Sequence, residues 1–332
     1  MSSRSTGSLP GRRRMPPPRK ARPEAGMADP VTWARFHNPA PNAPWWVRRR
    51  ELIFASPARV WRAITEPAEL VQWWCDSAEV DLRPHGAFEF GGPHVYGESH
   101  LRGGCSLGHP CEILEVEPES SLKLRWPLFG VSTVVHWELE NHMEATRLTV
   151  TQTAEAAPGW DPGGGMDWWW VALPTLRAYV EKGIPELRLD YAALRASERI
   201  RLESRFTTFP WVIWSKLTTP SEVGRWWAPC SALELRVGGA FRLDLKEGGP
   251  SSVLGVNEGS SFTHDWRWGE TTVSQVTWTI EEMDEDVLVR VEDKGPWPPG
   301  MPRDACGIRW AATLLLLQQM SERGLTPREH QD

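Results

Sequence analysis

The chain carries one segment twice, and this repeat is the strongest constraint on its fold. "PAELVQWW" begins at Pro67 and "PSEVGRWW" begins at Pro220, and both end in a pair of tryptophans. Residues 57–90 align with residues 210–243 without a gap. A repeat this long exceeds the roughly 20–50 residues of a solenoid unit, so the sequence predicts two copies of a whole domain. The match resumes later at these identical pairs: Trp137/Trp278, Trp169/Trp310, Leu173/Leu314, Leu176/Leu317, Glu181/Glu322 and Gly183/Gly324.

The sequence of each copy predicts the same order of helices and strands. A strand comes first, two short helices follow that are separated at a proline, and then a hairpin, further alternating strands and a closing helix. A glycine follows each closing helix, as is common at a helix C-cap. In the first copy we expect a strand at 48–55, a hairpin at 78–90, a strand at 131–140 and a helix at 167–182. The corresponding ranges in the second copy are 199–206, 231–243, 275–282 and 306–323.

This order resembles the helix-grip, or START-like, fold. The segments "ASPARVWRAITEPAELVQWW", "VDLRPHGAFEF" and "ILEVEPESSLKLRW" resemble the bacterial family named for similarity to the C-terminal domain of the activator of the heat-shock protein 90 ATPase, in the SRPBCC superfamily. The resemblance implies an α+β fold of two tandem helix-grip domains, each a curved antiparallel sheet wrapped on a long C-terminal helix. We expect the domains at 45–184 and 198–325, a linker at 185–197, and tails at 1–44 and 326–332.

The resemblance also implies a binding function. In folds of this kind the last helix and the sheet leave a cavity for apolar ligands, and tryptophan suits its lining because it is large and keeps one N–H. We therefore expect a small apolar or aromatic ligand, with no cofactor and no assigned catalytic residue. The alternative interpretation is that the tryptophans only fill the core. The expected ligand-binding residues are Trp73, Trp74, Trp126, Trp137, Trp169, Trp226, Trp227, His264, Trp266, Trp278 and Trp310.

His264 is the best polar candidate in this set. It aligns with Leu124 and lies between Phe262 and Trp266 on the strand face expected to line the cavity. A polar group on an apolar face costs stability unless it is paired, so His264 either anchors a ligand, exchanges a proton, or is a core histidine with its own partners. We expect a polar cavity in the second domain and a wholly apolar one in the first. On this hypothesis, His264→Leu stabilises the domain slightly.

Two other classes of function stay open. The resemblance implies a co-chaperone-like protein-interaction module with a chaperone as partner, although nothing here resembles the separate N-terminal domain of the family activator. A cyclase- or hydrolase-like enzyme would use His264 or an acid that the sequence does not identify.

One loop of the first copy holds residue types that bind zinc. The spacing of its five His and Cys residues fits no standard zinc site, and the second copy lacks all of them, so we predict no metal. The same loop matches the GxSxG pattern around Ser106, but a strand follows where a nucleophile elbow needs a helix. The five residues are His94, His100, Cys105, His109 and Cys111.

Charge and cysteine content exclude further classes. Residues 1–26 hold seven basic residues and one acidic residue, whereas the chain as a whole has a net charge of −6, so the body is strongly acidic. An acidic body argues against a nucleic-acid groove, and no apolar run is long enough to span a membrane. The basic tail is expected to be a disordered extension, or an extension upstream of a true start at Met27; a nucleic-acid or membrane-surface arm is the alternative. Five cysteines without a CxxC pair indicate reduced thiols and a cytoplasmic location.

Overall fold

The computed structural model describes residues 45–96, 111–128, 131–155, 164–245, 248–269, 271–299 and 303–322. The expected tails, and the loop residues His100, Cys105, Ser106 and His109, lie outside these ranges. The first domain consists of β1 (Trp45–Ile53), α1 (Pro57–Thr65), α2 (Pro67–Trp73), β2 (Ser77–Val80), β3 (Phe88–Gly91), β4 (Glu112–Glu117), β5 (Ser121–Leu128), β6 (Val131–His142), β7 (Ala145–Ala154) and α3 (Gly164–Lys182).

A short helix, α4 (Tyr191–Ala196), joins the two domains. The second domain repeats the order of the first, which confirms the prediction of tandem domains. Its elements are β8 (Ile200–Phe206), α5 (Pro210–Thr218), α6 (Pro220–Trp226), β9 (Cys230–Leu233), β10 (Phe241–Leu243), β11 (Val253–Asn257), β12 (Ser261–Trp268), β13 (Thr272–Glu282), β14 (Val287–Asp293) and α7 (Arg303–Glu322).

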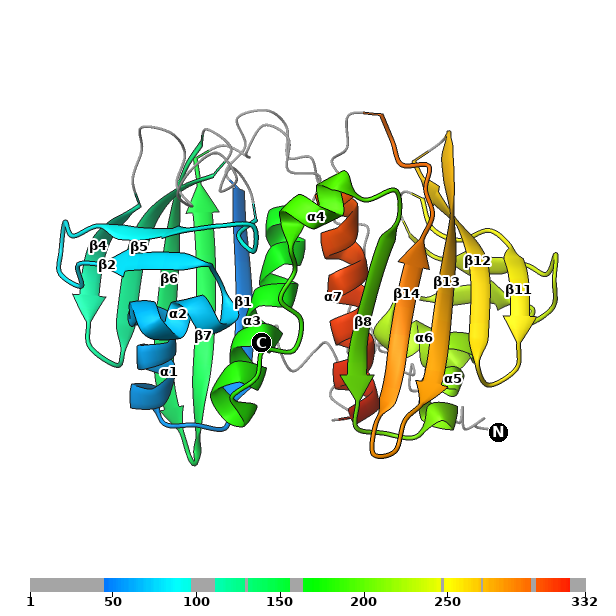
Figure 1. The fold of residues 1–332 in the computed structure, drawn as a ribbon, viewed down its shortest axis with the longest axis horizontal. Helices are drawn as coiled ribbons and strands as arrows, with labels where there is room; N and C mark the ends of the chain where they lie inside the picture. The colour runs from blue at the N-terminus through cyan, green and yellow to red at the C-terminus, as the bar shows by residue number, and fades with distance from the viewer. Residues whose placement is uncertain are drawn as a thin grey trace, which may run out of the picture.

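Each domain is built on a five-stranded antiparallel sheet. The strand orders are β1-β7-β6-β5-β4 and β11-β12-β13-β14-β8, which become the same order when equivalent strands are matched. A two-stranded ribbon, β2-β3 or β9-β10, accompanies each large sheet. Figure 1 shows the closing helices α3 and α7 side by side at the centre, with one sheet on each outer side. This is the expected α+β fold of two tandem helix-grip domains.

The closing helix of the second domain is buried on every face. Residues 304–320 are all buried, because α7 packs on its own domain on one side and on α3 on the other. Both closing helices begin three residues earlier than the sequence predicts, at Gly164 and Arg303. The predicted cap after α3 is confirmed, since Gly183 has a φ of 79° and its N–H donates to the carbonyl of Tyr179 at 2.8 Å.

The junction of α1 and α2 explains why the proline and the first tryptophan of the pair occur in both copies. Glu66 is extended before Pro67, which ends α1. Pro67 has no N–H, so the carbonyl of Ala63, four residues earlier, cannot complete its helical hydrogen bond. The indole N–H of Trp73 donates to that carbonyl at 2.9 Å. In the second domain the indole N–H of Trp226 donates to the carbonyl of Lys216 at 2.8 Å, four residues before Pro220.

The strands bury alternate side chains, as the sequence pattern predicts. On β6 the residues Val135, Trp137 and Leu139 are buried, and on β13 the pattern is repeated. These faces look onto α3 and α7, so each domain encloses an aromatic core between its sheet and its closing helix.

Candidate functional site

The structure brings the predicted tryptophans together in two clusters, one in each domain. In the first domain the ring centroids of Trp137 on β6 and Trp169 on α3 lie 5.2 Å apart, and those of Trp126 and Trp74 lie 5.8 Å apart. In the second domain Trp266 on β12 and Trp310 on α7 lie 5.0 Å apart. Their ligand-binding role stays a prediction. All ten predicted tryptophans are buried: Trp73, Trp74, Trp126, Trp137, Trp169, Trp226, Trp227, Trp266, Trp278 and Trp310.

In the second cluster the rings pack directly against one another. Trp227 stacks on Trp266 with a centroid separation of 5.7 Å and an interplanar angle of 6°. It also contacts Trp278 and Trp310 edge-on, at 6.0 and 6.4 Å. Contacts of this kind are the favoured geometries of a packed aromatic core. In the described residues, these side chains occupy the space between the sheet and α7.

The tryptophan of each closing helix is anchored to the sheet. The indole N–H of Trp169 donates to Oε1 of Gln152, and the indole N–H of Trp310 donates to Oδ2 of Asp293, both at 2.9 Å. The Asp293 carboxylate also accepts hydrogen bonds from the backbone N–H of Gly295 and the indole of Trp297. Burial raises the pKa of Asp293 despite these donors. Among the described residues the buried acids are Glu51, Asp293 and Asp304, and the partners of Asp293 are structural.

His264 lies on the predicted inward face of β12, and the structure gives it partners on both ring nitrogens. Nδ1 lies 2.6 Å from the carbonyl of Asp265, and the indole N–H of Trp278 donates to Nε2 at 3.3 Å. Nδ1 is therefore the protonated nitrogen and the imidazole is neutral. Burial lowers the pKa of His264 to about 4. No ring nitrogen is left to bind or protonate a ligand in this arrangement.

Two equivalent tryptophans have an indole N–H without a hydrogen-bond partner among the described residues. Trp74 and Trp227 follow α2 and α6 directly and are 4% and 0% exposed. In each, the buried Nε1 has no hydrogen-bond partner among the described residues. A buried N–H without an acceptor costs on the order of 1–3 kcal/mol, so each such donor needs an explanation.

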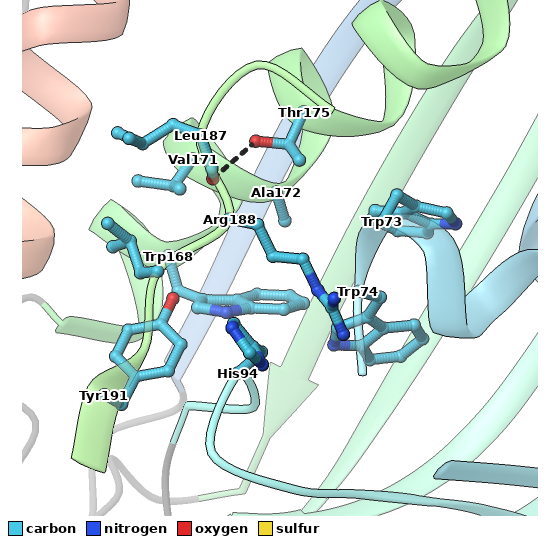
Figure 2. Close-up of a pocket in the computed structure, with 11 residues that line it drawn as sticks. Trp73, Trp74, His94, Trp168, Val171, Ala172, Thr175, Leu187, Arg188 and Tyr191 are labelled. Atoms are coloured by element: carbon cyan, nitrogen blue, oxygen red, sulfur yellow. Dashed lines mark hydrogen bonds between the residues drawn. The ribbon is translucent and has the colours of Figure 1, made fainter. Parts of the chain in front are cut away.

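In the first domain, Trp74 lines a cavity (Figure 2). The cavity lies between α2, α3 and the segment that leads into α4. Figure 2 shows the indole nitrogen of Trp74 on the side of its ring that faces Trp168 and Arg188. The lining residues are Trp73, Trp74, His94, Trp168, Val171, Ala172, Thr175, Leu187, Arg188, Leu189 and Tyr191.

The cavity is small and partly open. Its volume is about 20 Å³, which is room for about one water-sized group. The space between the lining side chains, including the part open to solvent, is about 270 Å³. Sites for drug-sized ligands measure about 300–1,000 Å³, so a ligand larger than a water-sized group requires the lining side chains to move.

Arg188 supplies the charge in the cavity wall. Its Nη2 donates to the carbonyl of Cys75 and lies 3.2 Å from Oδ1 of Asp76. Its Nε is buried and has no partner among the described residues. Asp76 also holds His94, whose Nδ1 lies 2.7 Å from Oδ1 of the carboxylate. The apolar cavity predicted for the first domain was expected between the sheet and α3, and that expectation stays a prediction. The cavity described here lies outside that space and is polar, because the linker brings a guanidinium to it.

The two hydroxyl groups of the wall, those of Thr175 and Tyr191, have hydrogen-bond partners. Thr175 donates its hydroxyl to the carbonyl of Leu187 at 3.1 Å, as the dashed line in Figure 2 shows. The Tyr191 hydroxyl is hydrogen-bonded to Trp168, and burial raises the pKa of Tyr191. Burial also raises the pKa of the neighbouring Cys75 thiol to about 12, so Cys75 is an unreactive structural thiol.

Sequence reasoning missed most of this cavity. It predicted Trp73 and Trp74, but not His94, Arg188 or Tyr191. The segment 187–191 was assigned to a linker and has no aligned counterpart in the second domain. Among the described residues, no group of three His, Cys, Asp or Glu side chains is placed to hold a metal, and no helix is long and apolar enough to cross a membrane.

The comparisons with known proteins identify both halves of the chain. The family model described as "Activator of Hsp90 ATPase homolog 1-like protein" matches residues 54–181 and 208–322. Among solved structures, DynU16 from the dynemicin biosynthetic locus is 21% identical, with a TM-score of 0.36, and the match covers 83% of this chain and 99% of DynU16. The Aha1 dimer from Colwellia psychrerythraea is 21% identical with a TM-score of 0.33, covering 38% of this chain and 97% of that one. CalU16 from Micromonospora echinospora is 22% identical with a TM-score of 0.32, covering 42% and 76%. Among curated proteins, none matches the chain.

Proposed function

Because the chain belongs to the family of Activator of Hsp90 ATPase homolog 1-like proteins in both of its halves, we propose that it is a binding protein for a small aromatic molecule. The proposed site is the cavity of the first domain, against the closing helix α3. No catalytic step is assigned to it.

One observation carries this proposal. Trp74 and Arg188 line the same cavity, and each has a buried donor, Nε1 of Trp74 and Nε of Arg188, without a partner among the described residues. Native interiors rarely leave buried donors unpaired, because each lost hydrogen bond costs free energy. A ligand that brings an acceptor to both would remove this cost, and the rings of Trp73, Trp74 and Trp168 offer it an aromatic wall.

The second domain has a different role in this proposal. Its tryptophans contact one another and His264 has two partners, so the described residues form a packed core. We assign it the task of supporting α7, against which α3 and the segment 191–196 pack.

The test compares ligand binding in the full chain with binding in Ala172→Leu. Ala172 lines the cavity, and leucine there would occupy part of the space needed by a ligand. Ligand-observed NMR with a panel of one-ring aromatic compounds should show binding to the unmodified chain and at least roughly tenfold weaker binding to the variant. Ala192→Leu, on the exposed face of α4, is the matched control and should bind as the unmodified chain does.

Two results would count against the proposal. One is equal binding by Ala172→Leu and the unmodified chain when both show a cooperative thermal melt. The other is no binding of any compound in the panel at millimolar concentration. Native mass spectrometry of the purified protein adds an independent readout, because a bound small molecule would appear as a defined mass increase.

A second candidate function, protein binding of the co-chaperone type, is favoured by one surface feature. Phe209 and Trp211 at the start of α5 are 66% and 69% exposed, and their rings stack at 6.4 Å. The first domain has Ser56 and Ala58 at the equivalent positions. Exposed aromatic side chains are typical of protein interfaces. The double change Phe209→Ser and Trp211→Ala should abolish any binding to a heat-shock protein 90 chaperone in isothermal titration calorimetry.

A further inference from the structure

We propose that the exposed aromatic pair of the second domain, Phe209 and Trp211, forms a docking surface together with the acidic turn 281–286, and that the basic, proline-rich segment 12–22 of the same chain binds there. The tail would then cover a surface of its own protein and keep other partners from it. This surface is distinct from the cavity of the first domain, and its role does not depend on what that cavity binds.

The two parts of this surface are neighbours at one end of the second domain. β14 begins at Val287, directly after the turn, and pairs there with Phe206, three residues before Phe209. α5 packs against β13, the strand that leads into the turn. Figure 1 shows the β13–β14 turn and the start of α5 at the same end of the domain. One bound segment can therefore contact both.

The aromatic pair offers a surface that suits proline. Phe209 and Trp211 are 66% and 69% exposed, and their rings lie 6.4 Å apart at an interplanar angle of 13°. The exposed indole of Trp211 also offers an N–H donor. Aromatic surfaces bind proline-rich segments because proline rings pack on them, and because an extended polyproline chain keeps its carbonyls free to accept hydrogen bonds.

The turn beside the pair is strongly acidic. Its residues 281–286 are Glu-Glu-Met-Asp-Glu-Asp, and all except Asp286 are exposed. Of these acids, Asp286 alone forms an ion pair among the described residues, with Arg205 at 3.9 Å. Alternation along β13 places Glu282 on the same face as the buried Ile280, the face that carries the helices. Four carboxylates are thus available to attract a cationic partner.

The segment 12–22 has the matching chemistry. Its sequence, "RRRMPPPRKAR", holds six basic residues and no acid, with three prolines between the two basic runs. The prolines suit the aromatic pair, and the flanking arginine and lysine side chains suit the carboxylates of the turn. The 22 residues from 23 to 44 span up to about 75 Å when extended, whereas the radius of gyration of a globular chain of this length is only about 20 Å. The segment can therefore reach this surface within its own chain.

The charge of the turn disfavours two other occupants. Nucleic acids and anionic lipid surfaces are negatively charged, so the carboxylates of the turn repel them. A chaperone that binds Phe209 and Trp211, the second candidate function above, would have to displace the tail. Such a partner should therefore bind more tightly when the tail has lost its charge.

The first domain offers an internal comparison, because it has neither feature. Ser56 and Ala58 stand where the second domain has the aromatic pair. The equivalent turn, 140–145, has two acids, and one of them, Glu140, pairs with Arg147 at 3.3 Å. The aromatic pair and the run of acids are therefore present together in one domain and absent together from the other, as expected if they bind one partner.

The first experiment is zero-length carbodiimide cross-linking of the full chain, read by mass spectrometry. This reaction joins an amine to a carboxylate that it contacts, and Lys20 is the one lysine in residues 1–44. We expect Lys20 to be joined to a carboxylate of the turn 281–286. The equivalent turn 140–145 also has exposed acids and should give no such product. In a mixture of isotopically labelled and unlabelled chains, each of these cross-linked products should contain one isotope only.

The second experiment measures how fast hydroxyl radicals oxidise Trp211 in the full chain. Met143, which is 90% exposed at the equivalent turn of the first domain, is the reference within the same molecule. Changing all six basic residues of 12–22 to glutamine should raise the rate at Trp211 at least roughly threefold, the change expected if the tail covers the ring about two thirds of the time. Raising the salt from about 0.01 M to about 1 M should have the same effect on the unmodified chain, because the Debye length falls from about 30 Å to about 3 Å.

Variants of the turn test the acidic half of the surface. Glu282→Gln, Asp284→Asn and Glu285→Gln together should expose Trp211 as the glutamine tail does. Glu140→Gln with Glu144→Gln, in the turn of the first domain, is the matched control and should leave the oxidation of Trp211 unchanged.

Three results would overturn the proposal. Equal oxidation of Trp211 in the unmodified chain and in the chain with the glutamine tail would show that the tail does not cover the aromatic pair. Cross-links from Lys20 to other acids, with none in 281–286, would place the tail elsewhere. Cross-links that contain both isotopes would show that the tail comes from a second copy of the chain.

Discussion

Trp73 donates its indole N–H to the carbonyl of Ala63. In a continuous helix residue 67 would donate to this carbonyl, but Pro67 has no N–H. The second domain repeats this contact with Trp226, Lys216 and Pro220. The first tryptophan of each pair is therefore a helix cap placed by the proline six residues before it. The second tryptophan has no such partner, and this difference separates two residues that look alike in the sequence.

Because of this difference, we expect substitutions at the two tryptophans of one pair to lower the free energy of unfolding by different amounts. Trp226→Phe removes the donor to Lys216 and leaves a carbonyl of α5 unpaired, whereas Trp227→Phe removes an N–H that has no described partner. Both side chains are fully buried, so the loss of ring size is matched. Urea unfolding should show Trp226→Phe to be less stable than Trp227→Phe by about 1–3 kcal/mol. Equal stabilities would show that the cap contributes nothing.

The fold could be predicted from the sequence because repetition and periodicity are local properties. The proline-tryptophan segments, the alternation around Trp137 and Trp278, and the glycine at 183 each appear in the structure where the pattern predicts them. The two copies match over so many positions that the repeat cannot be a chance similarity. None of this required knowledge of which side chains meet across the domain.

The cavity could not be predicted in the same way, because four of its eleven lining residues come from the linker, outside the repeat. Arg188 and Tyr191 lie in a segment whose pattern indicates only a linker, and their contacts depend on how that segment folds back onto α2 and α3. The partner of His264 could have been predicted from the pairing of the strands. Phe262 and Trp278 face each other across β12 and β13, which places Trp278 diagonally next to His264 on the same face.

The partners of His264 reverse the effect expected from the sequence for His264→Leu. The sequence favoured slight stabilisation, on the assumption of an unpaired polar group. In the structure, leucine would leave the fully buried indole N–H of Trp278 without its acceptor. We expect a loss of about 1–3 kcal/mol in the free energy of unfolding. An increase in stability by chemical denaturation would restore the earlier hypothesis.

The ion pair between Arg195 on α4 and the buried Asp304 on α7 gives a prediction about how the linker helix is attached to the second domain. Nη2 of Arg195 lies 2.5 Å from Oδ2 of Asp304, which is fully buried. Arg195→Ala would leave that carboxylate without its cation, at a cost of roughly 3–5 kcal/mol. Arg199→Ala is the control, because Arg199 is largely exposed and pairs with Glu292 only at 3.6 Å; its effect should stay below about 1 kcal/mol. Similar losses from both changes would contradict this prediction.

The segment that completes the cavity predicts different stabilities for two fragments of the first domain. Residues 45–186 lack Arg188 and Tyr191, whereas residues 45–192 keep the hydrogen bonds of these residues to Cys75 and Pro93. Both fragments expose the same face of α3, so the comparison isolates the segment. The longer fragment should melt at least several degrees higher, on the order of 1 kcal/mol of stability. Identical melting temperatures would show that the segment only connects the domains.

Protonation of His264 predicts how the stability of the protein depends on pH. Burial holds the pKa of His264 at about 4 in the folded chain, against an ordinary value of 6.5 when unfolded. Between these two values the unfolded chain binds a proton that the folded chain does not, so protonation favours unfolding. The contribution of neutral His264 is complete above pH 6.5 and is lost as the pH falls toward 4, by at most about 1.4 kcal/mol per pH unit. Carboxylates titrate in the same experiment, so the measurement compares the unmodified chain with His264→Gln. The difference in unfolding free energy between them should shrink as the pH falls from 6.5 to 4, and a constant difference would show that His264 does not titrate in this range.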